Sequence, residues 1–215
     1  LNSVLVETMR AGLDIVSLDE AHRRLREGDC TGRFACFTLD DGYRDNLEYA
    51  YPIFAAHGAP FTVYVPSEYP DGKGELWWVA LEKIIASGKS IENTAAGKGA
   101  VLPTGTDAEK DRAFDIVYQS LRKMDQDAQR AEISALCEKY GVDMGALCRD
   151  LILTWDEVRQ LAADPLVTIG AHTVAHFALA ALPEARARKE MKRGADRIAA
   201  ELGQRPEHFS YPYGD

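Results

Sequence analysis

The sequence of 215 residues contains no long apolar run and no excess of basic residues. No run approaches the ~20 apolar residues of a membrane-spanning helix, so we expect no transmembrane segment. Lysine and arginine total 25 against 34 aspartates and glutamates, which gives a net charge of −9. This balance argues against nucleic acid or an anionic membrane as the main partner, because both bind a basic face.

Cysteines are few, and they lack the spacing of metal ligands. None of the four forms a C-x-x-C pair, which argues against a zinc knuckle. We expect reduced core residues, and disulfides are the alternative. The four are Cys30, Cys36, Cys137 and Cys148.

The sequence also lacks a starting methionine and a recognisable signal peptide. Because it begins with Leu1, we interpret the N-terminus as cut or processed. We expect a cytoplasmic protein, and a secreted or periplasmic location is the alternative, since a removed signal leaves no trace in this sequence.

Capping residues predict two helices. Ser17 with Glu20, and Thr154 with Glu157, have the spacing of a capping box. The amphipathic pattern of a third helix has a basic stretch on its solvent-exposed face. The three helices are expected at 18–27, from 155 to about 163, and at 184–202.

Apolar runs predict buried strands at 33–39, 61–65 and 166–170. A helical pattern at 46–57 lies between the first two, and Pro52 must kink this helix or start its second segment. Strand, helix and strand in so short a span form a parallel, right-handed βαβ unit.

Residues 76–150 differ in character from the rest. Helical patterns dominate there, a glycine-rich loop lies near 95–106, and no strand pattern is clear. We therefore predict a helical insert at 76–150 within one domain made of 1–75 and 151–215. Trp77 and Trp78 are candidates for a sugar-stacking platform, or alternatively anchors of the insert.

Two strand ends carry residues that suit a metal. Asp40 and Asp41 follow the strand at 33–39, and His172 and His176 follow a later one. On a helical turn, histidines four apart present both imidazoles on one face, as a divalent metal requires. Ligands of α/β folds bind at the carboxyl ends of parallel strands, so we expect the two groups to meet.

Each feature also has a purely structural interpretation. The aspartates could form a turn and cap the helix that starts near Asn46, and His172 could be a satisfied histidine at a helix N-terminus. Both interpretations would have to hold together for the site to be absent.

Three motifs, in order, resemble the polysaccharide deacetylase family, the NodB-homology carbohydrate esterases. They are "FTLDDGYRDN", "HTVAH" and "FSYPYGD", and the stretch "LTWDEVRQLAADPLVTIGAHTVAHFALAAL" is also similar to its members. The resemblance covers most of 33–75 and 151–215 but not 76–150. It implies an α/β fold, a distorted (β/α) barrel, and metal-dependent hydrolysis of acetamido groups on amino-sugar polymers or glycans.

The resemblance also implies roles for individual residues. Asp41, His172 and His176 would ligate the metal, and Asp40 would be the catalytic base. The backbone N–H of Tyr213 would lie at the oxyanion. Three protein ligands leave a position open for water, as in catalytic zinc sites, so zinc is the first choice. Iron, cobalt and nickel are alternatives for this ligand set.

Two departures from the family pattern bear on activity. Ser210 stands where the family usually carries an arginine that orients the base, and Arg44 is a candidate to supply that charge instead. The general acid of the family is a histidine in a later motif. None of the five histidines of this sequence fits that place.

The length predicts an incomplete barrel. Without the insert, about 140 of the 215 residues remain, whereas a complete barrel needs ~250 or somewhat fewer. We expect the last strands, and also the first, to be missing, with completion by a neighbouring chain as one option.

The leading hypothesis is a polysaccharide deacetylase acting on N-acetylated carbohydrate, with a homodimer as an open expectation. The alternatives are an amidase acting on a small cyclic amide or ureide, and a catalytically inactive glycan-binding module. The retained metal triad favours deacetylation over the amidase. Ser210 and the missing late motif keep the inactive module open.

Overall fold

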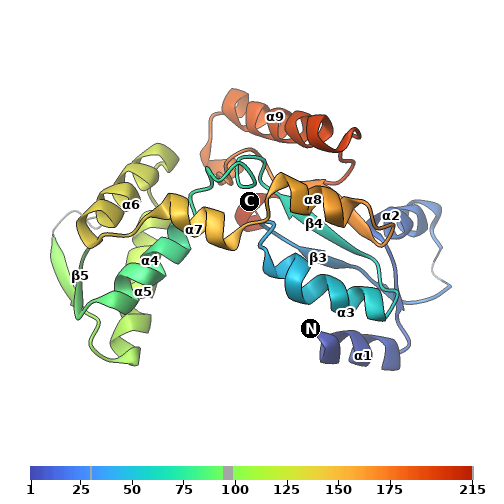
Figure 1. Cartoon of the computed structure of the whole chain (residues 1–215), viewed down its shortest axis with the longest axis horizontal. Coiled ribbons are helices and arrows are strands. Elements are labelled where there is room, and N and C mark those ends of the chain that lie inside the picture. Colours follow the sequence, from blue (N-terminus) through green and yellow to red (C-terminus); the bar gives the residue numbers. More distant parts are fainter. Residues whose placement is uncertain (30, 94–98, 215) are drawn as a thin grey trace. The chain divides into compact units, whose positions relative to one another are not determined.

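The computed structural model describes residues 1–29, 31–93 and 99–214. The chain divides into two compact units (Figure 1). We call Leu1–Lys73 with Leu151–Asp215 the sheet unit, and Gly74–Asp150 the helical unit. The predicted division into domains stays a prediction, because a compact unit does not show that either part folds by itself.

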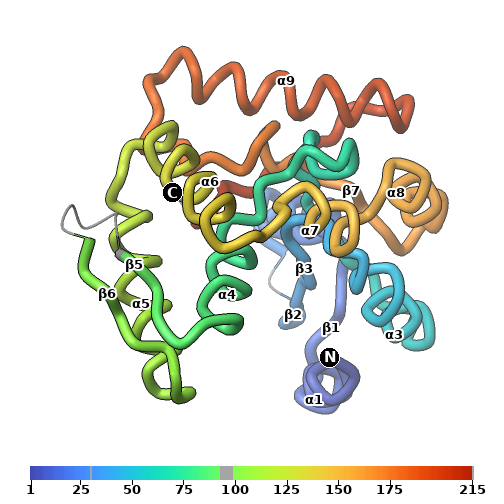
Figure 2. Tube along the Cα trace, turned by 60° about the vertical axis from the view of Figure 1, so that its left-hand side comes forward, coloured from blue at the N-terminus to red at the C-terminus, as the bar shows by residue number. Residues whose placement is uncertain are grey.

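A parallel sheet forms the centre of the sheet unit. Its order is β3-β4-β7, and every pairing is parallel. A smaller parallel pair, β1 with β2, precedes it in the chain (Figures 1 and 2). The strands are β1 (Asp14–Ile15), β2 (Phe34–Ala35), β3 (Phe37–Leu39), β4 (Phe61–Val65) and β7 (Val167–Ala171). The parallel βαβ prediction is therefore confirmed, although the strand expected at 33–39 is interrupted at Cys36.

Helices of the sheet unit begin and end close to where their capping residues predict. The Ser17 hydroxyl accepts the Glu20 N–H, and the Thr154 hydroxyl accepts the Glu157 N–H. A second helical segment, with Pro52 in its first turn, follows a short π-helix. The amphipathic helix has its predicted bounds. The helices are α1 (Asn2–Arg10), α2 (Leu18–Glu27), the π-helix η1 (Asn46–Ala50), α3 (Tyr51–Ala56), α8 (Trp155–Ala162) and α9 (Glu184–Leu202), with 3-10 turns at Leu179–Ala181 and Pro212–Gly214.

One face of the sheet packs against the apolar core, and the other carries a row of threonines. One face and the helices beside it bury an apolar core that includes Phe54 of α3, Val158 of α8 and Ile198 of α9. Side chains alternate along a strand, so threonines of β3, β4 and β7 face the other way. They are Thr38, Thr62 and Thr168, in matched register.

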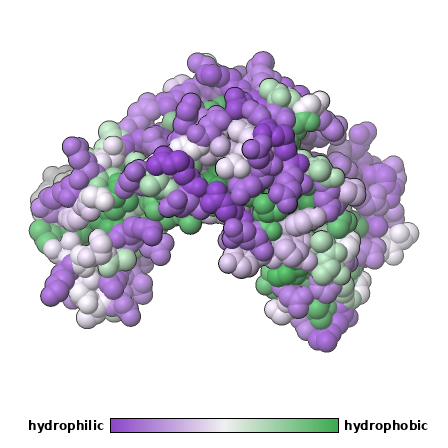
Figure 3. All heavy atoms as spheres, in the orientation of Figure 1, coloured by the Kyte–Doolittle hydropathy of each residue, from purple (hydrophilic) through white to green (hydrophobic). Residues whose placement is uncertain are grey.

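The sheet does not close on itself within the described residues, as expected for an incomplete barrel. Beyond β7, the next pairing is a single parallel bridge between Ala171 and Phe209. Most of the basic stretch on α9 is exposed, and Figure 3 shows a hydrophilic surface over this helix. The exposed residues are Arg188, Lys189, Lys192 and Arg193, whereas Arg186 is half-buried over the ring of Phe177. None of the helices in the described ranges has both the length and the apolar character that crossing a membrane requires.

The helical unit contains a β-hairpin that the sequence analysis missed. Strand β5 (Ser90–Asn93) pairs antiparallel with β6 (Ala100–Pro103), so the expectation of no strand is wrong. Ile91 is the buried anchor of this hairpin, and one apolar residue in so short a run gives little periodic signal. Residues 94–98 of the expected loop lie outside the described part. The helices are α4 (Trp77–Ser87), α5 (Asp107–Arg122), α6 (Gln126–Tyr140) and α7 (Met144–Leu151).

Buried aromatic and sulfur groups stabilise the helical unit. Trp77 is 2% exposed and stacks on Tyr118 at 4.9 Å between ring centroids, so it cannot serve as a sugar platform.

Cys137 and Cys148 are free and buried, and Cys36 of the sheet unit is free and half-buried. Burial raises the pKa of Cys137 to about 11. The expectation of reduced cysteines is confirmed for these three, and Cys30 lies outside the described residues.

We expect the Gly170→Ala substitution to destabilise the sheet unit by about 1–3 kcal/mol. An added Cβ on β7 would lie 2.4 Å from the ring of Tyr64 on the neighbouring strand. The matched control is Gly32→Ala, where the added Cβ would meet only the Asp14 carboxylate, at 3.6 Å. Denaturant unfolding measures the difference, and equal stability of the two variants would refute this view of the β4–β7 contact.

Candidate metal centre

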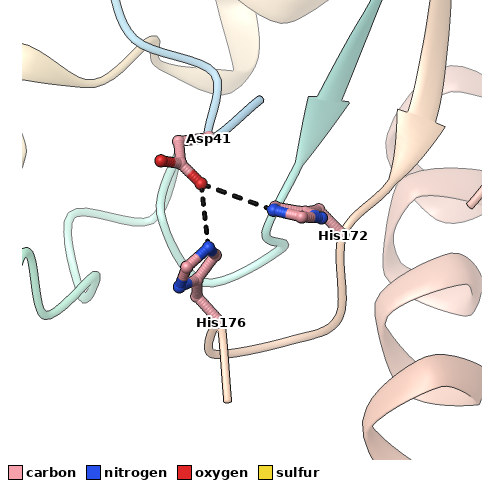
Figure 4. Close-up of side chains that lie close together, drawn as sticks. All are labelled: Asp41, His172 and His176. Atoms are coloured by element: carbon pink, nitrogen blue, oxygen red, sulfur yellow. Dashed lines mark ion pairs between the residues drawn. The ribbon is translucent and has the colours of Figure 1, made fainter. Parts of the chain in front are cut away.

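Three side chains from two parts of the sequence converge at one end of the sheet (Figure 4). Oδ1 of Asp41 lies 3.1 Å from Nε2 of His176 and 3.5 Å from Nε2 of His172. One ligand atom from each residue falls within 4.8 Å of the others, a spacing that could hold a metal ion. Asp41 follows β3 and His172 follows β7, so the expected meeting of strand ends occurs.

The group is buried and carries a charged carboxylate. The side chains are 1% exposed for His172, 7% for His176 and 16% for Asp41. Burial raises the pKa of Asp41, but the two adjacent imidazoles, when their Nε2 atoms carry protons, lower it more strongly, and the net pKa lies well below the usual range. Asp41 therefore remains ionised at neutral pH.

A backbone carbonyl sets the tautomer of the first histidine. Nδ1 of His172 lies 2.9 Å from the carbonyl oxygen of Ser210, which can only accept a hydrogen bond. Nδ1 must therefore carry the proton, and in the neutral ring Nε2 presents its lone pair to Asp41. Metal-bound histidines have this arrangement, in which the outer nitrogen donates to a carbonyl or carboxylate.

The donor set fits a divalent cation. Oδ1 of Asp41 is buried and accepts no hydrogen bond of good geometry in the described part of the chain. Two imidazole nitrogens and a carboxylate oxygen that face one another repel unless a proton or a cation lies among them. Two nitrogens and one oxygen are also the protein ligands of many catalytic zinc sites.

The backbone around this group adopts a conformation that side chains rarely allow. The non-glycine residues with positive φ in the described ranges are Asp41 (69°), Thr173 (68°), His176 (58°) and Tyr213 (62°). Two are candidate ligands and the others adjoin them. Such residues each cost on the order of 1–3 kcal/mol and cluster at functional sites. The segment 172–176 is a turn with left-handed residues, so the histidines are not brought together by a helical turn, the arrangement for which their spacing is typical.

Adjacent aspartates are separated by the turn that follows β3. The chain enters the left-handed region at Asp41 and stays there at Gly42, with φ of 69° and 65°. Asp41 thus turns towards the histidines, whereas Asp40 is exposed. Glycine is favoured at the second position because its φ of 65° lies in the left-handed region, which side chains rarely adopt. The two carboxylates are therefore in different environments.

Asp40 has no hydrogen-bonding or charged partner among residues 1–29, 31–93 and 99–214. Burial raises the pKa of the Tyr64 hydroxyl, and the charge of Asp40 raises it further. Among the described residues no hydrogen bond or ion pair reaches Asp40. Arg44 instead pairs with Glu157 at 3.2 Å and donates to the carbonyl of Ile152 at 2.9 Å. The suggestion that Arg44 orients Asp40 therefore finds no support.

The third motif lies beside the histidines. Tyr213 sits in the 3-10 turn of "YPYG", and its ring meets the ring of His176 edge-on at 4.8 Å. Ser210 contributes its main chain: its N–H donates to the carbonyl of Ala171, and its carbonyl accepts from His172. A contribution of this kind depends little on side-chain identity, which is why sequence reasoning missed it.

The chain belongs to the polysaccharide deacetylase family. The sequence pattern of that family, described as polysaccharide deacetylase, matches residues 107–215, about half of the chain. The match includes 107–150, which the sequence analysis set apart as an insert, together with both histidines and the "YPYG" turn. No curated protein sequence matches significantly.

Solved structures share the fold. IcaB from Ammonifex degensii has a TM-score of 0.57 at 17% identity, with 100% of this chain and 65% of that chain covered. The BpsB deacetylase domain from Bordetella bronchiseptica has a TM-score of 0.55 at 16% identity, with 100% of this chain and 69% of that chain covered. The deacetylase PplD from Streptococcus pyogenes, solved with acetate, has a TM-score of 0.55 at 16% identity, with 98% of this chain and 60% of that chain covered. This chain thus spans under two thirds of PplD.

We expect the chain to bind one zinc ion, and the His176→Ala variant to bind zinc at least about 100-fold more weakly. Loss of a group that only supports a ligand costs about 10–100-fold in metal affinity, and loss of a direct ligand should cost more. His57→Ala is the matched control, since that imidazole is half-buried, pairs with Asn2 and is not among the grouped ligands. Titration against a chelating dye measures the affinity. Unchanged zinc affinity of His176→Ala would contradict the assignment.

Proposed function

We propose that this chain forms the catalytic region of a metal-dependent deacetylase that removes N-acetyl groups from amino-sugar polymers or glycans. The observation that carries the proposal is the buried Asp41, His172 and His176 group at the carboxyl end of a parallel sheet. Family membership gives the reaction class. The acetate in the PplD structure supports the same chemistry, because acetate is the product of deacetylation.

Zinc is the metal that we propose for this group, with iron, cobalt and nickel as alternatives. When bound there, a divalent cation lowers the pKa of water, from 15.7 towards ~7 in favourable cases, and polarises a carbonyl oxygen. The residues that would hold it are Asp41, through Oδ1, and the Nε2 atoms of His172 and His176. The Ser210 carbonyl keeps the Nε2 lone pair of His172 available.

Two further residues would act directly on the reacting atoms. Asp40 is exposed at the same strand end and would accept the proton of the attacking water. The main-chain N–H of Tyr213 would donate to the acetamide oxygen as negative charge develops there, a contribution typically worth about 3–4 kcal/mol. Protonation of the departing sugar amine needs a general acid in addition to these residues.

One observation favours a second candidate function, which is not enzymatic. Asp40 lacks a hydrogen-bonding or charged partner among the described residues, so its orientation is not fixed by them. A catalytically inactive glycan-binding module would need no fixed base and is therefore the second candidate. An amidase acting on a small cyclic amide has no comparable support. A cytoplasmic location and a homodimer stay predictions.

We expect the Asp40→Asn variant of the full-length protein to lose about 10²- to 10⁴-fold in kcat on N-acetylated chitooligosaccharides, because the amide cannot accept the proton. Acetate release measures the rate. Zinc content should be unchanged, since Asp40 is not among the grouped ligands. The matched control is Asp107→Asn, whose side chain is 99% exposed. Equal activity of wild type and Asp40→Asn would dispose of this mechanism, and no activity in either would favour the binding module.

A further inference from the structure

A glutamate on α9 binds the backbone of the turn that carries both histidines. Oε2 of Glu190 accepts the N–H groups of Val174 and Ala175, each at 3.1 Å. These two residues lie between His172 and His176 in the sequence. The carboxylate therefore contacts the middle of the segment whose two ends would ligate the metal.

The bonding pattern is that of an anion held by consecutive main-chain donors. Successive N–H groups that point the same way form a concavity with partial positive charge, and a carboxylate is a suitable occupant. Hydrogen bonds to an ionised acceptor are roughly twice as strong as those between neutral groups. Glu190 thus stabilises one conformation of the turn.

That conformation needs stabilisation. Thr173 and His176 both have positive φ, at 68° and 58°, and a β-branched residue there is a genuine outlier. Within the turn, the Thr173 hydroxyl accepts the N–H of His176 at 2.9 Å. The bonds to Glu190 reach the two residues that separate these strained positions, so they act where the turn would otherwise relax.

A second residue of α9 brings the helix close to the same turn. Gly194 follows Glu190 by four residues and so lies on the same helix face. A Cβ at Gly194 would lie 2.5 Å from the carbonyl oxygen of Thr173, so only glycine allows this approach. Helix α9 therefore contacts the turn at two successive points, one polar and one purely steric.

We propose that Glu190 is a positioning residue, which fixes the 172–176 turn so that the Nε2 atoms of both histidines converge on Asp41. The proposal rests on the metal-ligand role of these three residues. Glu190 does not touch the ligand atoms themselves, and its effect passes through the main chain of Val174 and Ala175.

The test compares zinc affinity of Glu190→Ala, Glu190→Gln and Glu184→Ala in the full-length protein, by competition with a chelating dye. Loss of an outer partner of a metal site costs about 10–100-fold in affinity, and we expect Glu190→Ala to fall in this range. Glu190→Gln keeps one oxygen acceptor in a side chain of the same shape, so its zinc affinity should lie between those of Glu190→Ala and the wild type. Glu184 is the control because it is exposed on the same helix and pairs only with Arg188 in the described residues.

Hydrogen exchange of the apo-protein gives a readout that needs no metal. The amides of Val174 and Ala175 should exchange at least several-fold faster in Glu190→Ala, with a smaller change in Glu190→Gln. If Glu190→Ala unfolds, the Gln variant decides by the same measurements. Wild-type zinc affinity and wild-type amide protection in the folded variants would overturn the proposal.

Activity separates this proposal from the function proposed above. We expect Glu190→Ala at saturating zinc to lower kcat with little change in KM, because the substrate-binding surface is retained. A wild type that binds zinc but releases no acetate would contradict the deacetylase function and leave the positioning role supported by affinity and exchange. An active wild type with an equally active and equally tight-binding Glu190→Ala would contradict the positioning role alone.

Discussion

The convergence of two imidazole nitrogens on one buried carboxylate oxygen is the constraint on which the rest of this site depends. A turn must bring Asp41 away from its strand, and another must fold His176 back towards His172. Both turns enter the left-handed region, where side chains other than glycine are strained. The parallel sheet supplies the placement, since it puts both strand ends at the same edge.

Residues on neighbouring elements hold the histidines and their turn in this arrangement. The carbonyl of Ser210 fixes a tautomer, and Glu190 with Gly194 holds the histidine turn against α9. Most of these contributions come from the main chain or from residues that contact it. The serine that replaces an expected arginine therefore still has a structural role, although it supplies no charge. Asp40 lacks such support among the described residues, so no hydrogen bond or ion pair there fixes its orientation.

Much of the fold could be predicted from local sequence signals. Helix α2 and helix α9 have their expected bounds, and two predicted capping pairs form as hydrogen bonds. The candidate ligands could be found because the motif spacing identifies residue types at strand ends. The β5–β6 hairpin could not, because each of its strands has only four residues and β5 carries a single apolar residue, Ile91. The left-handed turn at 172–176 could not either, since Thr173 and His176 are residue types that rarely adopt positive φ.

The most direct test of the account is the position of zinc in a crystal of the protein grown with that metal. An anomalous difference map at the zinc edge should show one strong peak about 2.0–2.2 Å from a carboxylate oxygen of Asp41 and from Nε2 of each histidine. A peak at another place, or none at this group in zinc-containing crystals, would contradict the claim that Asp41, His172 and His176 form the metal centre.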